Sequence, residues 1–173
     1  MGDKLTAVYL VDANVLIDYL NSDISILTIY SKEIGQIYIP VDVLDRVKQM
    51  DTGDCNRLNL KIVEPTIEQY LEAGPKVRGL AFDDRICLVL AKENKWTCIT
   101  NDKQLRATCE KYGISVVWGL EIMLPLVEKE LIEPTDALHI AKDIHESNPF
   151  FVNKIILKRF EDKIGKIIRK KKP

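Results

Sequence analysis

Short apolar runs alternate with amphipathic stretches along this chain, and this alternation is the feature that most limits its fold. The runs are rich in β-branched or aromatic side chains and too short for helices. We therefore expect strands at residues 7–11, 36–40, 60–64, 97–100 and 114–118. Strands that alternate with helices predict a parallel sheet covered on both faces, which is an α/β fold.

The intervening segments show helical spacing of apolar residues, with glycines, prolines or polar caps at their ends. The clearest predicted helix spans residues 82–95, for which Asp83 is a candidate N-cap. Residues 51–54 are expected to form a turn. The other predicted helices are residues 15–20, 24–34, 41–50, 66–73, 103–112, 120–131, 135–145 and 150–168.

The length of 173 residues suits one domain with a helical appendage. We expect a domain over residues 1–120 and a C-terminal helical extension over residues 121–173 that packs on it. The last helix places Ile156, Phe160, Ile164 and Ile167 on one face. That face must be buried against its own domain, a second subunit or a partner, and packing on its own domain is our expectation.

Composition excludes several classes of protein. Hydrophobic residues make up 46% of the chain, an ordinary share for a globular protein, and no run approaches the roughly 20 apolar residues that span a bilayer. Residues 1–4 do not begin a signal peptide, so we expect a soluble, cytoplasmic protein with no membrane contact. Cys55, Cys87, Cys98 and Cys109 form no C-x-x-C unit, which argues against zinc; Cys87 and Cys98 are predicted core residues.

Charge is unevenly distributed along the chain. The net charge is −1, yet residues 154–173 contain nine basic and two acidic residues. A basic tail on an acidic body indicates a contact with nucleic acid or with the body itself, and a solvated helix face explains it equally well.

Three aspartates stand where a parallel sheet collects ligand-binding residues. Asp12 directly follows the first predicted strand, Asp102 follows the strand at residues 97–100, and Asp84 lies at the start of the helix that precedes that strand. The carboxyl ends of parallel strands meet at one edge, so we expect these carboxylates to share it. Mg²⁺ or Mn²⁺ would relieve their repulsion and could activate water for attack on a phosphate. Each aspartate could equally be a helix cap.

Three segments carry a resemblance to a known family. Residues 11–17, with the sequence VDANVLI, resemble the opening signature of PIN domains, nucleases that include the VapC-like toxins. Residues 79–88, GLAFDDRICL, resemble the central segment of these domains, and the aligned acid is Asp84. Residues 97–103, TCITNDK, resemble the closing strand and its aspartate. The resemblance covers about residues 7–118, and a weaker likeness extends to the C-terminal helices.

The resemblance implies a three-layer α/β/α fold with a parallel central sheet and a metal-dependent ribonuclease site. Asp12, Asp84 and Asp102 would be the catalytic residues and would bind Mg²⁺ or Mn²⁺, with Asn14 and Thr100 as supporting polar residues. The implied partners are RNA, a second copy of the chain in a homodimer and an antitoxin protein, because the VapC-like members are toxins of toxin–antitoxin pairs.

One position departs from the family pattern. The family usually carries a glutamate two residues after a leucine on the helix after the second strand, and here that position holds Arg46. Asp42, one turn earlier on the same flank, is the candidate substitute metal ligand, whereas Asp45 should face solvent. Asp42 could instead complement the helix dipole or pair with Arg46. Arg46 could neutralise the carboxylates or bind a substrate phosphate.

Two other functions stay open. In the first, the chain is a weakly active or inactive PIN protein that binds RNA or another protein, a hypothesis that Arg46 favours. In the second, it is a receiver-type regulator or a phosphotransferase, but these need paired acids or a D-x-D arrangement that residues 11–14 lack.

Overall fold

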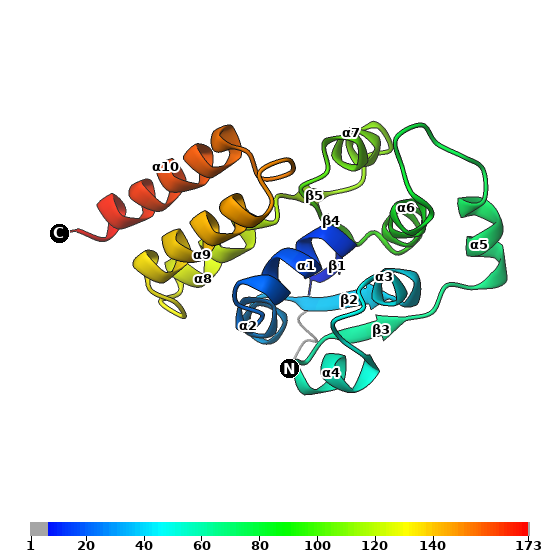
Figure 1. Cartoon of the computed structure of the whole chain (residues 1–173), viewed down its shortest axis with the longest axis horizontal. Helices are drawn as coiled ribbons and strands as arrows, with labels where there is room; N and C mark the ends of the chain where they lie inside the picture. The colour runs from blue at the N-terminus through cyan, green and yellow to red at the C-terminus, as the bar shows by residue number, and fades with distance from the viewer. Residues whose placement is uncertain (1–6, 173) are drawn as a thin grey trace, which may run out of the picture.

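A computed structural model describes residues 7–172, in which five parallel strands form one sheet of order β3-β2-β1-β4-β5 (Figure 1). All five predicted strands are present, although most are shorter than expected. Pairs run from β1 to both β2 and β4, so the first strand of the chain is the middle of the sheet. The strands are β1 (Val8–Val11), β2 (Gln36–Pro40), β3 (Lys61–Val63), β4 (Thr97–Ile99) and β5 (Val116–Val117).

Helices follow or precede each strand, as the alternation of the sequence predicts. Those between the strands are α1 (Ala13–Asn21), α2 (Ser25–Glu33), α3 (Val41–Arg46), α4 (Thr52–Arg57), α5 (Ile67–Ala73), α6 (Phe82–Asn94) and α7 (Lys103–Lys111). Those after β5 are the 3₁₀ turn η1 (Leu120–Ile122), α8 (Met123–Glu128), α9 (Pro134–Ser147) and α10 (Lys154–Lys171).

The two faces of the sheet are covered by different helices, because side chains along each strand alternate between them. Leu10 and Cys98 point into a cluster with residues of α6 and α7. Val11 and Ile99 point to the opposite face, into a larger cluster with residues of α1, α2 and the C-terminal helices. All four side chains are fully buried. The result is the three-layer α/β/α arrangement that the sequence predicts.

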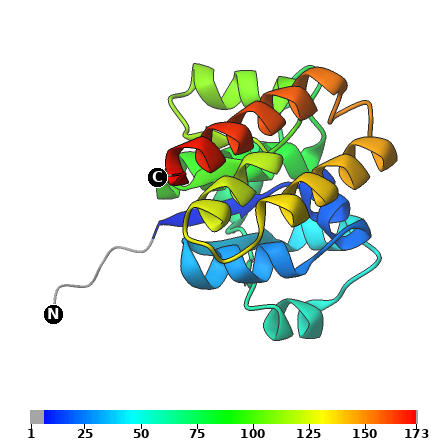
Figure 2. The same ribbon diagram turned by 90° about the vertical axis from the view of Figure 1, so that its left-hand side faces the viewer.

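The C-terminal helices complete the larger cluster. α8, α9 and α10 pack on one another, α9 contacts α1 and α8 contacts α2 (Figures 1 and 2). The predicted apolar face of α10 is buried, and Phe160 and Ile164 lie in the same cluster as Val11. This face is therefore covered by the chain's own helices.

The predictions for residues 41–54 are wrong in part. Residues 51–54, predicted as a turn, open α4, because Asp51 and Asp54 form a reciprocal capping box with each other's backbone N–H groups. The helix predicted over residues 41–50 ends at Arg46, and Val47 is extended with φ −94° and ψ 90°.

The N-cap of α6 also differs from the prediction. Ala81 occupies that position, and the Asp84 carboxylate accepts the Ala81 N–H at 2.9 Å. Asp83 lies within the first turn of the helix instead. The acid that caps α6 is thus the one that the family resemblance assigns to the site.

Three further predictions concern the cysteines, membrane-spanning helices and a signal peptide. The four cysteines are buried with free thiols, as expected for Cys87 and Cys98. No helix within residues 7–172 is long and apolar enough to cross a membrane. Residues 1–4, where no signal peptide is expected, lie outside the described residues.

Candidate metal centre

Asp12 stands at the end of the central strand and is almost fully buried, with 1% of its surface exposed. Its backbone N–H donates to the Ile99 carbonyl, which continues the pairing of β1 with β4. One carboxylate oxygen accepts the Val15 N–H at 2.8 Å and so caps α1, and the other accepts the Thr100 hydroxyl. Burial, and then the charges of Asp84 and Asp18, raise the pKa of Asp12 to about 7 against the lowering effect of these hydrogen bonds.

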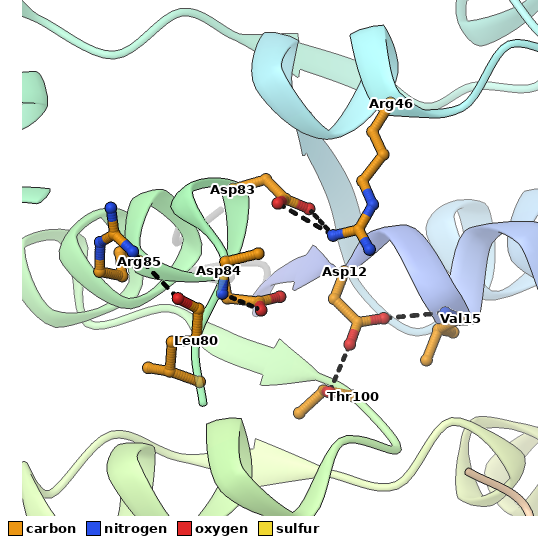
Figure 3. A network of polar contacts seen from close by, with 9 residues as sticks. Asp12, Val15, Arg46, Leu80, Asp83, Asp84, Arg85 and Thr100 are labelled. Carbon is orange, nitrogen blue, oxygen red and sulfur yellow. Dashed lines mark hydrogen bonds and ion pairs between the residues drawn. The ribbon is translucent and has the colours of Figure 1, made fainter. Parts of the chain in front are cut away.

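Thr100 joins two of the predicted site residues. Its hydroxyl donates to the Asp12 carboxylate (Figure 3). The same hydroxyl accepts the backbone N–H of Asp102 at 3.0 Å. Asp102 uses one carboxylate oxygen to accept the Gln104 and Leu105 N–H groups at 2.7 and 2.9 Å, which caps α7. The predicted supporting role of Thr100 thus has a geometric basis at the ends of β1 and β4.

Asp84 approaches from α6. The residue is 8% exposed, and one carboxylate oxygen accepts the Ala81 N–H. Burial raises the pKa of Asp84, and the charges of Asp83 and Asp102 add to that rise. The segment before α6 is fixed by Arg85, which donates to the carbonyls of Ala73 and Leu80 at 2.8 and 2.9 Å. The charge of Asp84 therefore contributes to the raised pKa of Asp12, and the charge of Asp102 contributes to the raised pKa of Asp84.

Arg46 reaches from the end of α3 to Asp83, whose two oxygens accept from one guanidinium nitrogen at 3.0 and 2.9 Å (Figure 3). Hydrogen bonding to Asp83 raises the pKa of Arg46, and the charges of Asp84 and Asp12 act in the same direction. The arginine at the usual glutamate position is thus accompanied by an extra acid beside Asp84. The Arg46 side chain is 47% exposed, so part of the guanidinium remains open to solvent.

Within residues 7–172, the remaining predicted site residues form no hydrogen bond with Asp12, Asp84 or Asp102. Asp42 instead accepts the Tyr70 hydroxyl at 3.1 Å, on the side of α5. Asp45 is exposed, as predicted. Asn14 is half-buried in the first turn of α1, and its side chain makes no hydrogen bond with residues 7–172.

A buried polar network beside the site was not foreseen from the sequence. Asp18 of α1 accepts from Asn101 at 3.4 Å and from Asn148 at 2.9 Å. Burial raises the pKa of Asp18 to about 6, although these two amide donors lower it. Asn101 also accepts the Gly119 N–H at 2.8 Å, and a Cβ on Gly119 would lie 2.7 Å from the Asn101 amide. The only sequence signal for Asp18 is its position on α1, one helical turn after Asn14.

The donor set has the chemistry of a hard-cation site. One carboxylate oxygen of each aspartate accepts a backbone N–H at a helix N-terminus, which fixes the orientation of the side chain at the carboxyl edge of the sheet. The three residues are Asp12, Asp84 and Asp102. Within residues 7–172, no three His, Cys, Asp or Glu side chains stand close enough together to hold a metal ion among them. Mg²⁺ commonly binds through one or two carboxylates and several waters, so one or two of these aspartates would suffice for such an ion.

Comparison with known proteins identifies the fold. No protein-family model and no curated protein matches the chain. Among solved structures, the chain is similar to a PilT N-terminus domain protein from the hyperthermophilic archaeon Sulfolobus solfataricus P2, with a TM-score of 0.52. The match covers 67% of this chain and 90% of that chain, at 12% sequence identity. At this identity the likeness concerns the fold alone, which is PIN-like, as the sequence predicts.

Proposed function

We propose that this protein is a metal-dependent ribonuclease that hydrolyses RNA phosphodiester bonds with Mg²⁺ or Mn²⁺ bound at Asp12 and Asp84. The observation that carries the proposal is the burial of these two carboxylates, which raises both of their pKa values. The charge of Arg46 lowers the pKa of Asp84 but does not cancel this rise, so the buried acids still favour binding of a cation. The PIN-like fold, which generally belongs to nucleases, supports the same proposal.

The residues of the proposed site would have different roles in catalysis. Asp12 and Asp84 would hold the metal ion, and Asp102, linked to Asp12 through Thr100, would complete the acidic edge from the side of α7. A bound divalent ion supplies an activated water and neutralises charge on the phosphate. Thr100 keeps Asp12 oriented, and its hydrogen bond favours the ionised carboxylate that a cation needs.

Cleavage of a mixed RNA pool in the presence and absence of Mn²⁺ tests the proposal. Wild-type protein should cleave only with the metal, and Asp84→Asn should lose at least about a hundredfold in rate if it removes a metal ligand. Asp45→Asn is the matched control, because Asp45 is exposed on α3 and should leave the rate unchanged. Equal cleavage by wild type and Asp84→Asn, or cleavage by neither, would refute the enzyme.

The ion pair between Arg46 and Asp83 favours a second candidate, a PIN-like protein that binds RNA or protein without cleaving it. In that case the Arg46 guanidinium replaces the metal as the counter-charge at the acidic edge. Calorimetric titration with Mn²⁺ separates the two functions. A catalytic site binds the ion and loses it in Asp12→Asn, whereas a non-catalytic protein binds no Mn²⁺ in either form.

The biological role rests on the family resemblance alone. We propose the toxin of a toxin–antitoxin pair, of the VapC-like type, acting as a homodimer under control of an antitoxin protein. Expression of wild type and Asp84→Asn in a bacterial host tests this role. Growth arrest by the wild type but not by the variant is the expected result, and normal growth with both would remove the toxin assignment.

A further inference from the structure

The turn before α10 presents two phenylalanines to solvent. Phe150 is 83% exposed, and its ring packs edge-to-face on Phe151 with centroids 5.0 Å apart. Both ends of the turn are fixed: Val152 is fully buried, and its carbonyl contacts the His145 ring nitrogen at 2.6 Å. Exposed apolar side chains that stand singly are ordinary, but this ring belongs to an aromatic pair that can serve as a binding surface.

This aromatic turn borders the acidic edge. A hollow of about 420 Å³ is lined by Phe150 and Phe151 on one side and by Asp102, Lys103 and Gly79 on the other. The Asp18 carboxylate fixes the two walls to each other, because it accepts from Asn148 at the start of the turn and from Asn101 next to Asp102. The exposed rings are therefore held in a constant position beside a predicted site residue.

Basic side chains continue from the turn along α10. The exposed face of this helix carries Lys154, Lys158, Arg159 and Lys166. Lys158 pairs with Asp162 at 3.0 Å, whereas Lys154, Arg159 and Lys166 form no ion pair with residues 7–172. The helix begins next to the aromatic turn and runs away from the sheet (Figure 1).

A second contact fixes the start of this basic face at the same edge of the sheet. The Arg159 guanidinium lies 5.5 Å from the ring centre of Trp118, and that of Arg106 lies 3.8 Å from it. Trp118 directly follows β5, so it stands at the carboxyl edge where Asp102 follows β4. The aromatic turn and the basic face thus form one surface that leads away from the acidic site.

We propose that this surface binds single-stranded RNA, with a base stacked on Phe150 and the following phosphates on Lys154, Arg159 and Lys166. The choice of RNA rests on the proposed function. An exposed aromatic ring joined to a basic track is the combination by which proteins bind single strands, because every base offers a face for stacking. The surface would hold the strand so that a phosphodiester enters the acidic edge beside Asp102.

The charges favour RNA over a protein partner. The face is basic over the length of α10, roughly 27 Å at 1.5 Å per residue, which suits a chain with a charge at every nucleotide. Its apolar part is confined to the two rings and Ile155, which is 71% exposed. An apolar groove of the kind that receives an amphipathic helix is not formed by these residues.

Fluorescence anisotropy with a labelled single-stranded RNA of mixed sequence, in EDTA to prevent cleavage, tests the stacking contact. Phe150→Ala should weaken binding about 5- to 100-fold, and Phe150→Tyr should restore it. Binding to an RNA duplex, whose bases are already stacked, should change less than twofold. Leu71→Ala is the matched control, because Leu71 is 73% exposed on α5 and should leave binding unchanged.

The salt dependence of binding tests the basic track. Each lost phosphate contact lowers the slope of log K against log salt by about 0.7 for a single strand, so Lys154→Ala with Lys166→Ala should lower it by about 1.4. Lys32→Ala with Lys95→Ala is the control pair. Both lysines are exposed and precede strands, at the opposite edge of the sheet.

The outcomes separate this proposal from the ribonuclease. Binding that Phe150→Ala leaves intact, or wild type that binds no RNA at low salt, overturns the RNA surface even if the protein cleaves RNA. If wild type binds no RNA, the aromatic turn would instead be a candidate surface for a protein partner. Binding that depends on Phe150 in a protein without cleavage supports the RNA surface and refutes the enzyme. Equal affinity for a DNA strand of the same sequence would overturn the choice of RNA, because it would show that the 2′-hydroxyl is not recognised.

Discussion

Each of the three aspartates of the proposed site caps a helix with one carboxylate oxygen. One oxygen of Asp12, Asp84 and Asp102 receives backbone N–H groups at a helix start, and the alternatives of helix cap and site residue are therefore compatible. Their positions relative to strands and helices were readable from the sequence. The Arg46–Asp83 pair was not, because the two residues come from separate helices and only the fold brings them together.

The raised pKa of Asp12 should make metal binding at the proposed site depend on pH. Below about pH 7 this carboxyl carries a proton that a cation must displace, so Mn²⁺ affinity should rise roughly tenfold per pH unit up to about pH 7 and level off above it. Calorimetry between about pH 5.5 and about pH 8 measures this dependence. Affinity that stays constant over this range would show that Asp12 is not a ligand, and Asp12→Asn should bind weakly throughout.

At the scale of elements, α1 carries a connection that no local pattern reveals. Asp18 joins the β4–α7 loop to the turn before α10, across sequence separations of 83 and 130 residues. Periodicity predicted the strands and most helices because it records burial of one face. It missed α4, whose six residues are held by the capping box of Asp51 rather than by an apolar stripe.

Burial of Asp18 should make stability depend on pH in a predictable direction. Its folded pKa of about 6 lies above the usual 3.8, so the folded state favours the protonated form. The stability from this group is complete below about pH 4 and is lost as pH rises through about 6, by at most about 3 kcal/mol.

Urea unfolding of wild type and Asp18→Asn without divalent metal measures this effect. The difference in unfolding free energy, wild type minus variant, should fall as pH increases from about 4 to about 7 and then stay level. A difference that rises over this interval would mean that the carboxylate is stabilised by its two amide donors more than it is penalised by burial.

At the scale of the whole molecule, the C-terminal helices are part of the main core. We predicted that residues 121–173 pack on the domain formed by residues 1–120, and Phe160 and Ile164 are buried in the same cluster as Val11 and Leu27. A chain ended at residue 120 would leave the covered faces of α1 and α2 in water.

Such a truncated chain should therefore fail to fold by itself. We expect it to aggregate or to lose near-ultraviolet circular dichroism while the full chain gives a cooperative thermal transition. Phe160→Ala in the full chain removes only part of the same core packing and should lower the unfolding free energy by about 3–5 kcal/mol. A truncated form that melts cooperatively would establish residues 1–120 as an independent domain.

The strand order has a consequence for how the molecule is made on the ribosome. The middle strand, β1, is synthesised before the other strands. Its neighbour β4 begins only at Thr97, and α10, which carries the buried Phe160, follows all five strands. A growing polypeptide thus has Asp12 long before Thr100 and Asp102 exist to stand beside it. The acidic edge therefore cannot assemble before β4 has been made and has paired with β1, and the proposed ribonuclease would be inactive in any shorter nascent chain.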